Sequence, residues 1–212
     1  MPGRSYQQSC SLARALDTVG ERWTLLVVRE LLIGPLRYGE IQDRLPGIGT
    51  NLLAERLKHM ERLGLAEKLP GNGGHRWGLT AAGMGLEPVL MALIRWGMKT
   101  RLPSRPGEIS RTEWDLIAMK ALFVPTQADG LEGTFQLVLN AFPAVLAIRS
   151  GGLEIIRGRA ESPEAIIDMD SSTGWQLATG SLGRPEAVAT GRLKISGSTG
   201  AAERLLDCLR LT

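Results

Sequence analysis

The sequence predicts two domains, a helix-rich domain followed by an α+β domain with a mostly antiparallel sheet. Three observations support this division. The segment LPSRPGEIS (102–110) concentrates proline, glycine and polar residues, as interdomain linkers do. Before it, apolar residues recur at helical spacing; after it, short runs of branched apolar residues alternate with turn residues. We therefore expect domains at residues 1–101 and 111–212, joined by a linker at 102–110.

The first domain opens with three predicted helices, each followed by glycine or proline, residues that favour helix ends. These helices lie at residues 11–19, within 21–34 and at 37–45. The second helix has an apolar face made of Trp23, Leu26, Val27 and Leu31. The third closes at Pro46-Gly47, which predicts a tight turn before the next element.

The fourth predicted helix covers residues 50–64, because Leu53, Leu57 and Met60 recur at i, i+4 and i+7. Two short extended runs then flank the glycine-rich stretch 70–74, which indicates a hairpin. An apolar helix follows from about residue 81, and Pro88 within it indicates a kink or a start nearer Glu87. The order helix, short helix, tight turn, helix and hairpin is the layout of a winged helix-turn-helix.

The outer face of the fourth helix is polar and suits the major groove of DNA. Thr50 and Asn51 can bond base edges, and Ala54 can pack on a thymine methyl group. Cations further along the helix and in the hairpin can neutralise phosphates or enter the minor groove. The predicted DNA-binding residues are Arg37, Tyr38, Thr50, Asn51, Ala54, Glu55, Lys58, Arg62, His75 and Arg76. Arg56 lies at the edge of the apolar stripe, so it either contacts phosphate or forms an internal ion pair.

Such a charged face on one helix is usually only solvated, and it is the combination with the turn and the basic hairpin that favours DNA binding. The charge distribution agrees with a polyanionic partner on the first half. Residues 1–102 hold 14 Lys and Arg against 9 Asp and Glu, whereas residues 103–212 hold 11 against 13.

Residues 10 to about 99 resemble the HxlR-type winged-helix regulators. The resemblance is carried by Cys10 and by the segments GERWTLLVVREL, RYGEI, LAERLKHMERLGL, LTAAG and LEPVLMALIRWG. It implies a homodimer on a palindromic double-stranded operator, joined through the helix at 11–19 and the one ending near Trp96-Gly97. Some members of that family sense oxidants or electrophiles with a cysteine at the position of Cys10. The alternative for Cys10 is a small, partly buried apolar residue.

The second domain is predicted to mix strands and helices. Ser110 and Glu113 form a capping box ahead of a helix. Strand-like runs follow in FQLVLN, AVLAIRSG, LEIIRGR, AIIDMD and AVATGRLKIS, with a short helix in SSTGWQLATG and a closing helix in AAERLLDCLRL. Residues 160–211 resemble the sterol-carrier-protein-2-like (SCP2-like) domain, which implies an apolar cavity for a hydrophobic small-molecule effector.

Residues expected to line that cavity are Trp114, Leu122, Phe135, Ile155, Trp175 and Leu177. The alternative is that these side chains fill a solid core. We expect no enzymatic activity, because this half has no histidine and its single Cys208 lies among apolar neighbours. No cofactor is expected either, since neither a phosphate loop nor a dinucleotide fingerprint is present. No metal site is expected, because Cys10 and Cys208 lie at opposite ends of the chain and form no cluster of metal ligands.

The sequence thus predicts a ligand-responsive DNA-binding regulator. Two other hypotheses remain: a regulator that senses oxidants through Cys10, with a structural or lipid-carrying second domain, and an enzyme with an accessory DNA-binding domain. We expect a cytoplasmic protein with free thiols and no membrane partner, because the first residues lack a secretory pattern and no apolar run approaches the roughly 20 residues of a membrane span.

Overall fold

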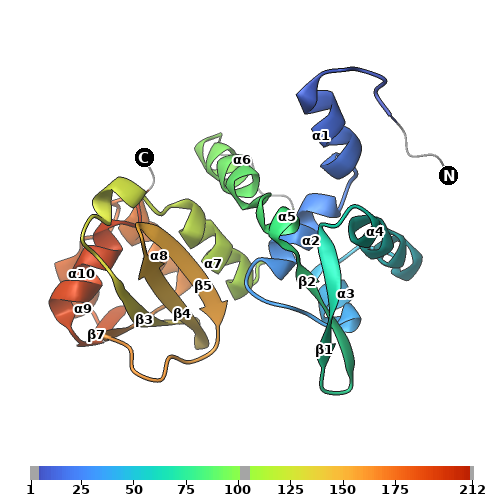
Figure 1. Ribbon diagram of the computed structural model, residues 1–212. Helices are drawn as coiled ribbons and strands as arrows, with labels where there is room; N and C mark the ends of the chain where they lie inside the picture. Colours follow the sequence, from blue (N-terminus) through green and yellow to red (C-terminus); the bar gives the residue numbers. More distant parts are fainter. Residues whose placement is uncertain (1–4, 101–105, 211–212) are drawn as a thin grey trace. The chain divides into compact units, whose positions relative to one another are not determined.

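The computed structural model describes residues 5–100 and 106–210 (Figure 1). The chain divides into two compact units between Leu90 and Met91. The predicted domain boundaries at 101 and 111 stay a prediction, and residues 102–105 of the predicted linker lie outside the described residues. Within the described residues, none of the helices is both long and apolar enough to cross a membrane.

The first unit has the predicted winged helix-turn-helix order (Figure 1). Its elements are α1 (Ser11–Val19), α2 (Thr24–Leu31), α3 (Tyr38–Arg44), α4 (Thr50–Arg62), β1 (Ala66–Gly71), β2 (Gly74–Leu79) and α5 (Ala81–Met84), followed by α6 (Glu87–Lys99), which spans the division. Because α6 begins at Glu87, Pro88 lies in the first turn, where its missing N–H costs no helical hydrogen bond. The start near Glu87, and not a kink, is therefore the correct alternative.

The core beneath the hairpin comes mainly from α2, α3 and α4. Val27, Ile41, Leu53, Leu57 and Met60 are completely buried. The predicted apolar face of the second helix is wrong in part. Leu26 is 39% exposed, and Trp23 precedes α2 with a left-handed backbone (φ 88°), so it is not on the helix face.

Two contacts between elements fix α3 in the first unit. Glu30 of α2 is buried, and its carboxylate lies 2.5 Å from Arg29 Nη2 and 3.9 Å from Arg44 Nη1 of α3. Just before α3, Leu36 and Trp77 of β2 exchange backbone hydrogen bonds of 2.9 and 2.7 Å. The hairpin is thereby attached to the segment that leads into the helix-turn-helix.

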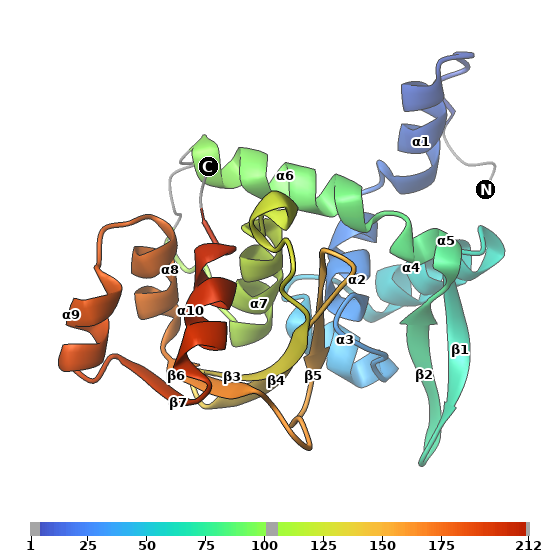
Figure 2. The same cartoon turned by 60° about the vertical axis from the view of Figure 1, so that its left-hand side comes forward.

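The second unit contains a five-stranded sheet in the order β5-β4-β3-β6-β7. Its strands are β3 (Gly133–Leu139), β4 (Phe142–Arg149), β5 (Gly152–Arg157), β6 (Ala165–Met169) and β7 (Leu193–Gly197). Only the β3–β6 pair is parallel among the strand pairs of the described residues, so the prediction of a mostly antiparallel sheet is confirmed. Helices α7 (Thr112–Ala121), α8 (Ser171–Ala178) and α10 (Thr199–Asp207) lie over one face of this sheet (Figure 2).

Two local predictions for this unit are wrong. The run at 187–196 is not one strand, because α9 (Arg184–Ala189) takes its first residues and β7 starts at Leu193. Pro185 lies in the first turn of α9, a position that suits a helix start. Ser110 does not cap α7, whose N-cap residue is Arg111, without a capping side-chain hydrogen bond. The remaining element is a single 3-10 turn, η1 (Pro125–Gln127).

Candidate DNA-binding surface and apolar cavity

Helix α4 separates its residues into a buried and an exposed side. Leu53, Leu57 and Met60 are completely buried. The predicted contact residues lie on the opposite side, where Thr50, Asn51, Glu55, Lys58 and Arg62 are exposed and Ala54 is half-buried. The helix starts after Gly49, which offers no capping side chain, so the first-turn N–H groups lack that partner. An uncapped helix start favours an anion such as phosphate.

Three predicted contact residues also make internal hydrogen bonds around α3. The Tyr38 hydroxyl donates to the carbonyl oxygen of Thr50 at 2.6 Å, which joins the start of α3 to the start of α4. The Arg37 guanidinium donates to the carbonyl oxygen of Asn72 at the hairpin turn. Arg76 donates to the carbonyl oxygen of Pro35 at 3.2 Å. A guanidinium has five N–H donors, so these arginines position the hairpin and keep donors for a further partner.

The other basic side chains near α4 have different surroundings. Arg56 is paired with Glu21 at 3.4 Å, which is the internal ion pair that the sequence left as one of two alternatives. His75 is exposed on the hairpin, with its ring edge-on to Trp77 at 5.9 Å. Sequence reasoning missed His59, which lies next to Arg62 on α4. Burial, followed by the charges of Arg56 and Arg62, lowers the pKa of His59, which favours its neutral form.

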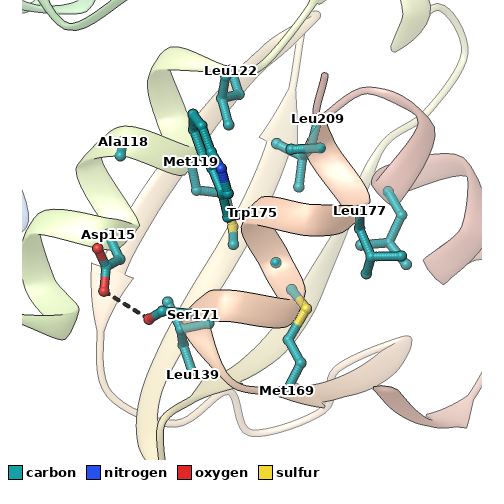
Figure 3. A pocket seen from close by; sticks show the side chains of 13 residues that line it. Asp115, Ala118, Met119, Leu122, Leu139, Met169, Ser171, Trp175, Leu177 and Leu209 are labelled. Atoms are coloured by element: carbon teal, nitrogen blue, oxygen red, sulfur yellow. Dashed lines mark hydrogen bonds between the residues drawn. The ribbon is translucent and has the colours of Figure 1, made fainter. Parts of the chain in front are cut away.

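The second unit contains an apolar cavity of about 80 Å³ between helices and sheet (Figure 3). Residues of α7 reach it at the helical spacing i, i+3, i+4 and i+7, while α8, the ends of β3 and β6, and the end of the chain close the other sides. The lining residues are Asp115, Ala118, Met119, Leu122, Leu139, Met169, Ser171, Gly174, Trp175, Leu177, Ala178, Leu206 and Leu209.

Half of the predicted cavity residues lie in this wall. Leu122, Trp175 and Leu177 line the cavity, whereas Trp114, Phe135 and Ile155 do not. Phe135 and Ile155 both flank Leu146 in the strand register, and all three are buried as a continuous row of core. That row packs solidly, as the alternative interpretation expected for these two residues. The i, i+3, i+4 and i+7 spacing from Asp115 to Leu122 was the available signal for the α7 wall.

One end of the cavity is polar, and the sequence analysis did not anticipate it. The Ser171 hydroxyl donates to Asp115 Oδ2 at 2.7 Å (Figure 3). Asn140 Nδ2 donates to Ser171 Oγ at 2.6 Å and to Thr112 Oγ1 at 3.1 Å. Burial raises the pKa of Asp115, and the hydrogen bond from Ser171 offsets this in part.

The two cysteines lie in opposite environments. Cys10 is exposed immediately before α1, and hydrogen bonding by the backbone N–H groups of Ala13 and Leu12 lowers the pKa of its thiol. Cys208 is buried, and burial raises the pKa of its thiol, which donates to the carbonyl oxygen of Arg204 at 3.1 Å. Cys10 is therefore the more reactive of the two. Within residues 5–100 and 106–210, His, Cys, Asp and Glu form no cluster of three that could hold a metal ion.

Comparison with known proteins agrees with both halves of this architecture. The HxlR-like helix-turn-helix family model matches residues 18–104, and the SCP-2 sterol transfer family model matches residues 120–210. A protein of Mycobacterium tuberculosis named as an uncharacterized HTH-type transcriptional regulator is 40% identical over 90 residues. That match covers 41% of this chain and 56% of the relative, so this chain spans little more than half of the relative's length.

Two Bacillus subtilis proteins are also similar to part of this chain. The HTH-type transcriptional regulator YvaP, described as uncharacterized, is 33% identical over 94 residues, which cover 43% of this chain and 87% of YvaP. The crystal structure of quinone-bound YodB is 31% identical and covers 42% of this chain and 96% of that one, with a TM-score of 0.38. From the sequence matches, the chain belongs to the HxlR-like helix-turn-helix family of transcriptional regulators, and its second half carries a domain of the SCP-2 sterol transfer family.

Proposed function

We propose that this protein is a homodimeric transcription regulator that binds a palindromic operator through α4 and the hairpin. The observation that carries the proposal is the division of α4 into a buried apolar side and an exposed polar side. Asn51, Lys58 and Arg62 share the exposed side, so short hydrogen-bonding groups precede cations along one helix face. Base edges are the expected partners of Thr50 and Asn51, and phosphates those of Lys58 and Arg62.

The wing and the preceding helix complete the proposed contact. Arg37 and Arg76 each bond a backbone carbonyl across the base or the turn of the hairpin. These bonds support a rigid wing whose exposed His75 and remaining guanidinium donors face DNA. Tyr38 is proposed to act chiefly by holding α4, because its hydroxyl proton is already donated to Thr50.

A second copy of the chain is the proposed partner of α1 and α6. Leu12 and Leu16 of α1 are exposed, as are Val89, Leu93 and Trp96 of α6. Large apolar side chains that are exposed on a helix favour burial against another surface. A homodimer through these helices would also place two copies of α4 so that each binds one half-site of a palindromic operator.

The second unit is proposed to hold a hydrophobic small-molecule effector in its cavity. Pockets for drug-sized molecules occupy roughly 300–1,000 Å³, whereas this cavity measures about 80 Å³. We therefore propose a compact effector, or one that enters as α7 and α8 separate. Regulation requires that the effector bind the DNA-competent and DNA-incompetent states with different affinity, typically by about 1–3 kcal/mol.

A second candidate function is sensing of oxidants or electrophiles through Cys10. The observation that favours it is an exposed thiol whose pKa is lowered by the first N–H groups of α1. A lowered thiol pKa raises the thiolate fraction, which is the reactive form. Alkylation of Cys10 in the purified protein should then change DNA affinity, and an unchanged affinity would exclude this role.

Two variants test the proposed reading surface on an operator that the purified protein selects from random duplexes. We expect Asn51→Ala to relax base preference. Lys58→Ala should weaken binding to every sequence and flatten the salt dependence, because each lost phosphate contact lowers the slope by about 0.9. The ratio of the DNA affinity of the wild-type protein to that of Lys58→Ala should then fall about 3.5-fold between roughly 50 and 200 mM salt.

Lys194→Ala is the matched control, since it removes the same charge from an exposed position on β7 in the other unit. It should leave the slope unchanged. Retention of wild-type affinity and base preference by both Asn51→Ala and Lys58→Ala would refute the proposed reading surface.

A further inference from the structure

The cavity of the second unit carries a single ionisable side chain among the described residues that line it. Asp115 lies at one end next to Ser171, and the rest of the lining is glycine, aliphatic side chains, methionine and Trp175. Figure 3 shows the carboxylate at the α7 side, joined by a hydrogen bond to Ser171. A ligand in this space therefore meets an acidic group at one end and apolar surface elsewhere.

The hydrogen bonds at this end lead from Asn140 through Ser171 to the carboxylate, and the second Nδ2–H of Asn140 is donated to Thr112 Oγ1. Asn140 Nδ2 donates to Ser171 Oγ at 2.6 Å, and Ser171 Oγ donates its one proton to Asp115 Oδ2 at 2.7 Å. The Asn140 amide and the Ser171 hydroxyl therefore have no proton left to donate to a ligand. Within the part of the chain that the structure describes, Asp115 Oδ1 receives no hydrogen bond. Asp115 Oδ1 is consequently an acceptor that carries negative charge, and a ligand that binds there should supply a hydrogen-bond donor.

Among the residues that the structure describes, no cation contributes to the pKa of Asp115. Burial is the larger influence on its pKa and raises it, while the hydrogen bond from Ser171 acts in the opposite direction. A half-buried carboxylate of this kind gains from a positive partner more than an exposed one does, because water screens the pair less.

Trp175 supplies a second feature that favours a cation. Its side chain extends from α8 across the cavity toward α7 and remains 44% exposed (Figure 3). The face of an indole attracts a positive charge, and tryptophan does so most strongly among the aromatic side chains. The sulfur atoms of Met119 and Met169 add polarisable surface that adapts to an apolar ligand.

We propose that the cavity selects a compact lipophilic cation, an organic ammonium whose N–H donates to Asp115 Oδ1 and whose apolar body packs on Met119, Leu122 and Trp175. This inference rests on the proposed function, because it names the chemical class of the effector assumed there. It also excludes a class: an anionic headgroup such as a fatty-acid carboxylate meets like charge at the polar end and is rejected.

The test compares three probes that differ only in their headgroup. The full chain is titrated by calorimetry at pH 7.5 with 1-hexylamine, 1-hexanol and hexanoate, where the amine is protonated and the acid ionised. We expect the amine to bind at least about tenfold more tightly than the alcohol, and hexanoate to bind most weakly. In Asp115→Asn, the amine should fall to the affinity of the alcohol, while the alcohol should bind as it does to wild type.

Asp129→Asn is the matched control, because Asp129 is exposed on the loop before β3 and does not line the cavity. It should keep the full preference for the amine. If Asp115→Asn fails to fold, the comparison of the three headgroups on the wild-type protein still tests the preference for a cation.

Three results would overturn the inference. If hexanoate or hexanol matched hexylamine on wild type, the cavity would have no cation preference, while an apolar effector would stand. A preference that survived in folded Asp115→Asn would place its origin outside this carboxylate. If none of the probes bound, the effector role in the proposed function would fail together with the inference.

Discussion

Replacing Asp170 by alanine removes the side chain that caps α8, the helix that carries Trp175 into the cavity. Asp170 Oδ1 accepts a hydrogen bond from the backbone N–H of Thr173 at 2.6 Å. Loss of such a cap costs about 1 kcal/mol of stability. For a unit of this size that corresponds to a fall in Tm of about 4 °C. Asp170→Asn is the control, because asparagine caps helices about as well as aspartate does.

The stability lost in Asp170→Ala should be smaller at acidic pH than at neutral pH. The Thr173 backbone N–H, followed by the Thr173 side chain, lowers the pKa of Asp170 below its ordinary value of 3.8. A carboxyl whose pKa is lower in the folded state contributes stability above its unfolded pKa and loses that contribution as pH falls through the folded pKa. The difference between wild type and Asp170→Ala should therefore be full at pH 7 and shrink below about pH 3.8.

Thermal unfolding of the full chain at pH 7 and at about pH 3 measures this difference, and hydrogen exchange locates it. The Thr173 amide should exchange faster in Asp170→Ala at pH 7, with little change in the amides of α4. A penalty independent of pH, or an Asp170→Asn protein as unstable as Asp170→Ala, would refute the reasoning.

Two further predictions concern the first unit. Tyr38→Phe should lower its stability by about 0.5–1 kcal/mol, seen as a lower Tm, because the hydroxyl bonds Thr50 in the free protein; an unchanged Tm would instead favour a role in DNA contact alone. Gly83→Ala should destabilise by about 2 kcal/mol or more in urea unfolding, because an added Cβ would overlap the backbone carbonyl oxygen of Leu65. Gly97→Ala, where a Cβ meets open space, is its control and should retain wild-type stability.

Local pattern was enough to predict the faces of α4. Leu53, Leu57 and Met60 are completely buried and Lys58 is exposed, as their spacing requires. Residues within one helix keep fixed angular relations, so burial of one side determines the other without knowledge of what covers it. Local patterns also predicted the order of elements in the first unit and a mostly antiparallel sheet in the second.

Short apolar segments were less well determined. Residues 187–189 have the composition of a strand yet form the end of α9, and Ser110 had the spacing of a cap that α7 does not use. Short runs satisfy helical and extended periodicities equally, so packing against the rest of the unit decides between them.

For the proposed DNA-binding surface, the sequence by itself determined which residues share one face of a helix. Only the tertiary structure decided which of them also bond elsewhere: Arg37 and Arg76 reach carbonyl groups 35 and 41 residues away. Only the tertiary structure decided the polar end of the cavity as well, since Ser171 Oγ lies 2.7 Å from Asp115 Oδ2 although the two residues are 56 positions apart in the sequence. Periodicity describes neighbours along one element, whereas these pairs exist because separate elements pack on a common core, and no local pattern records that distance.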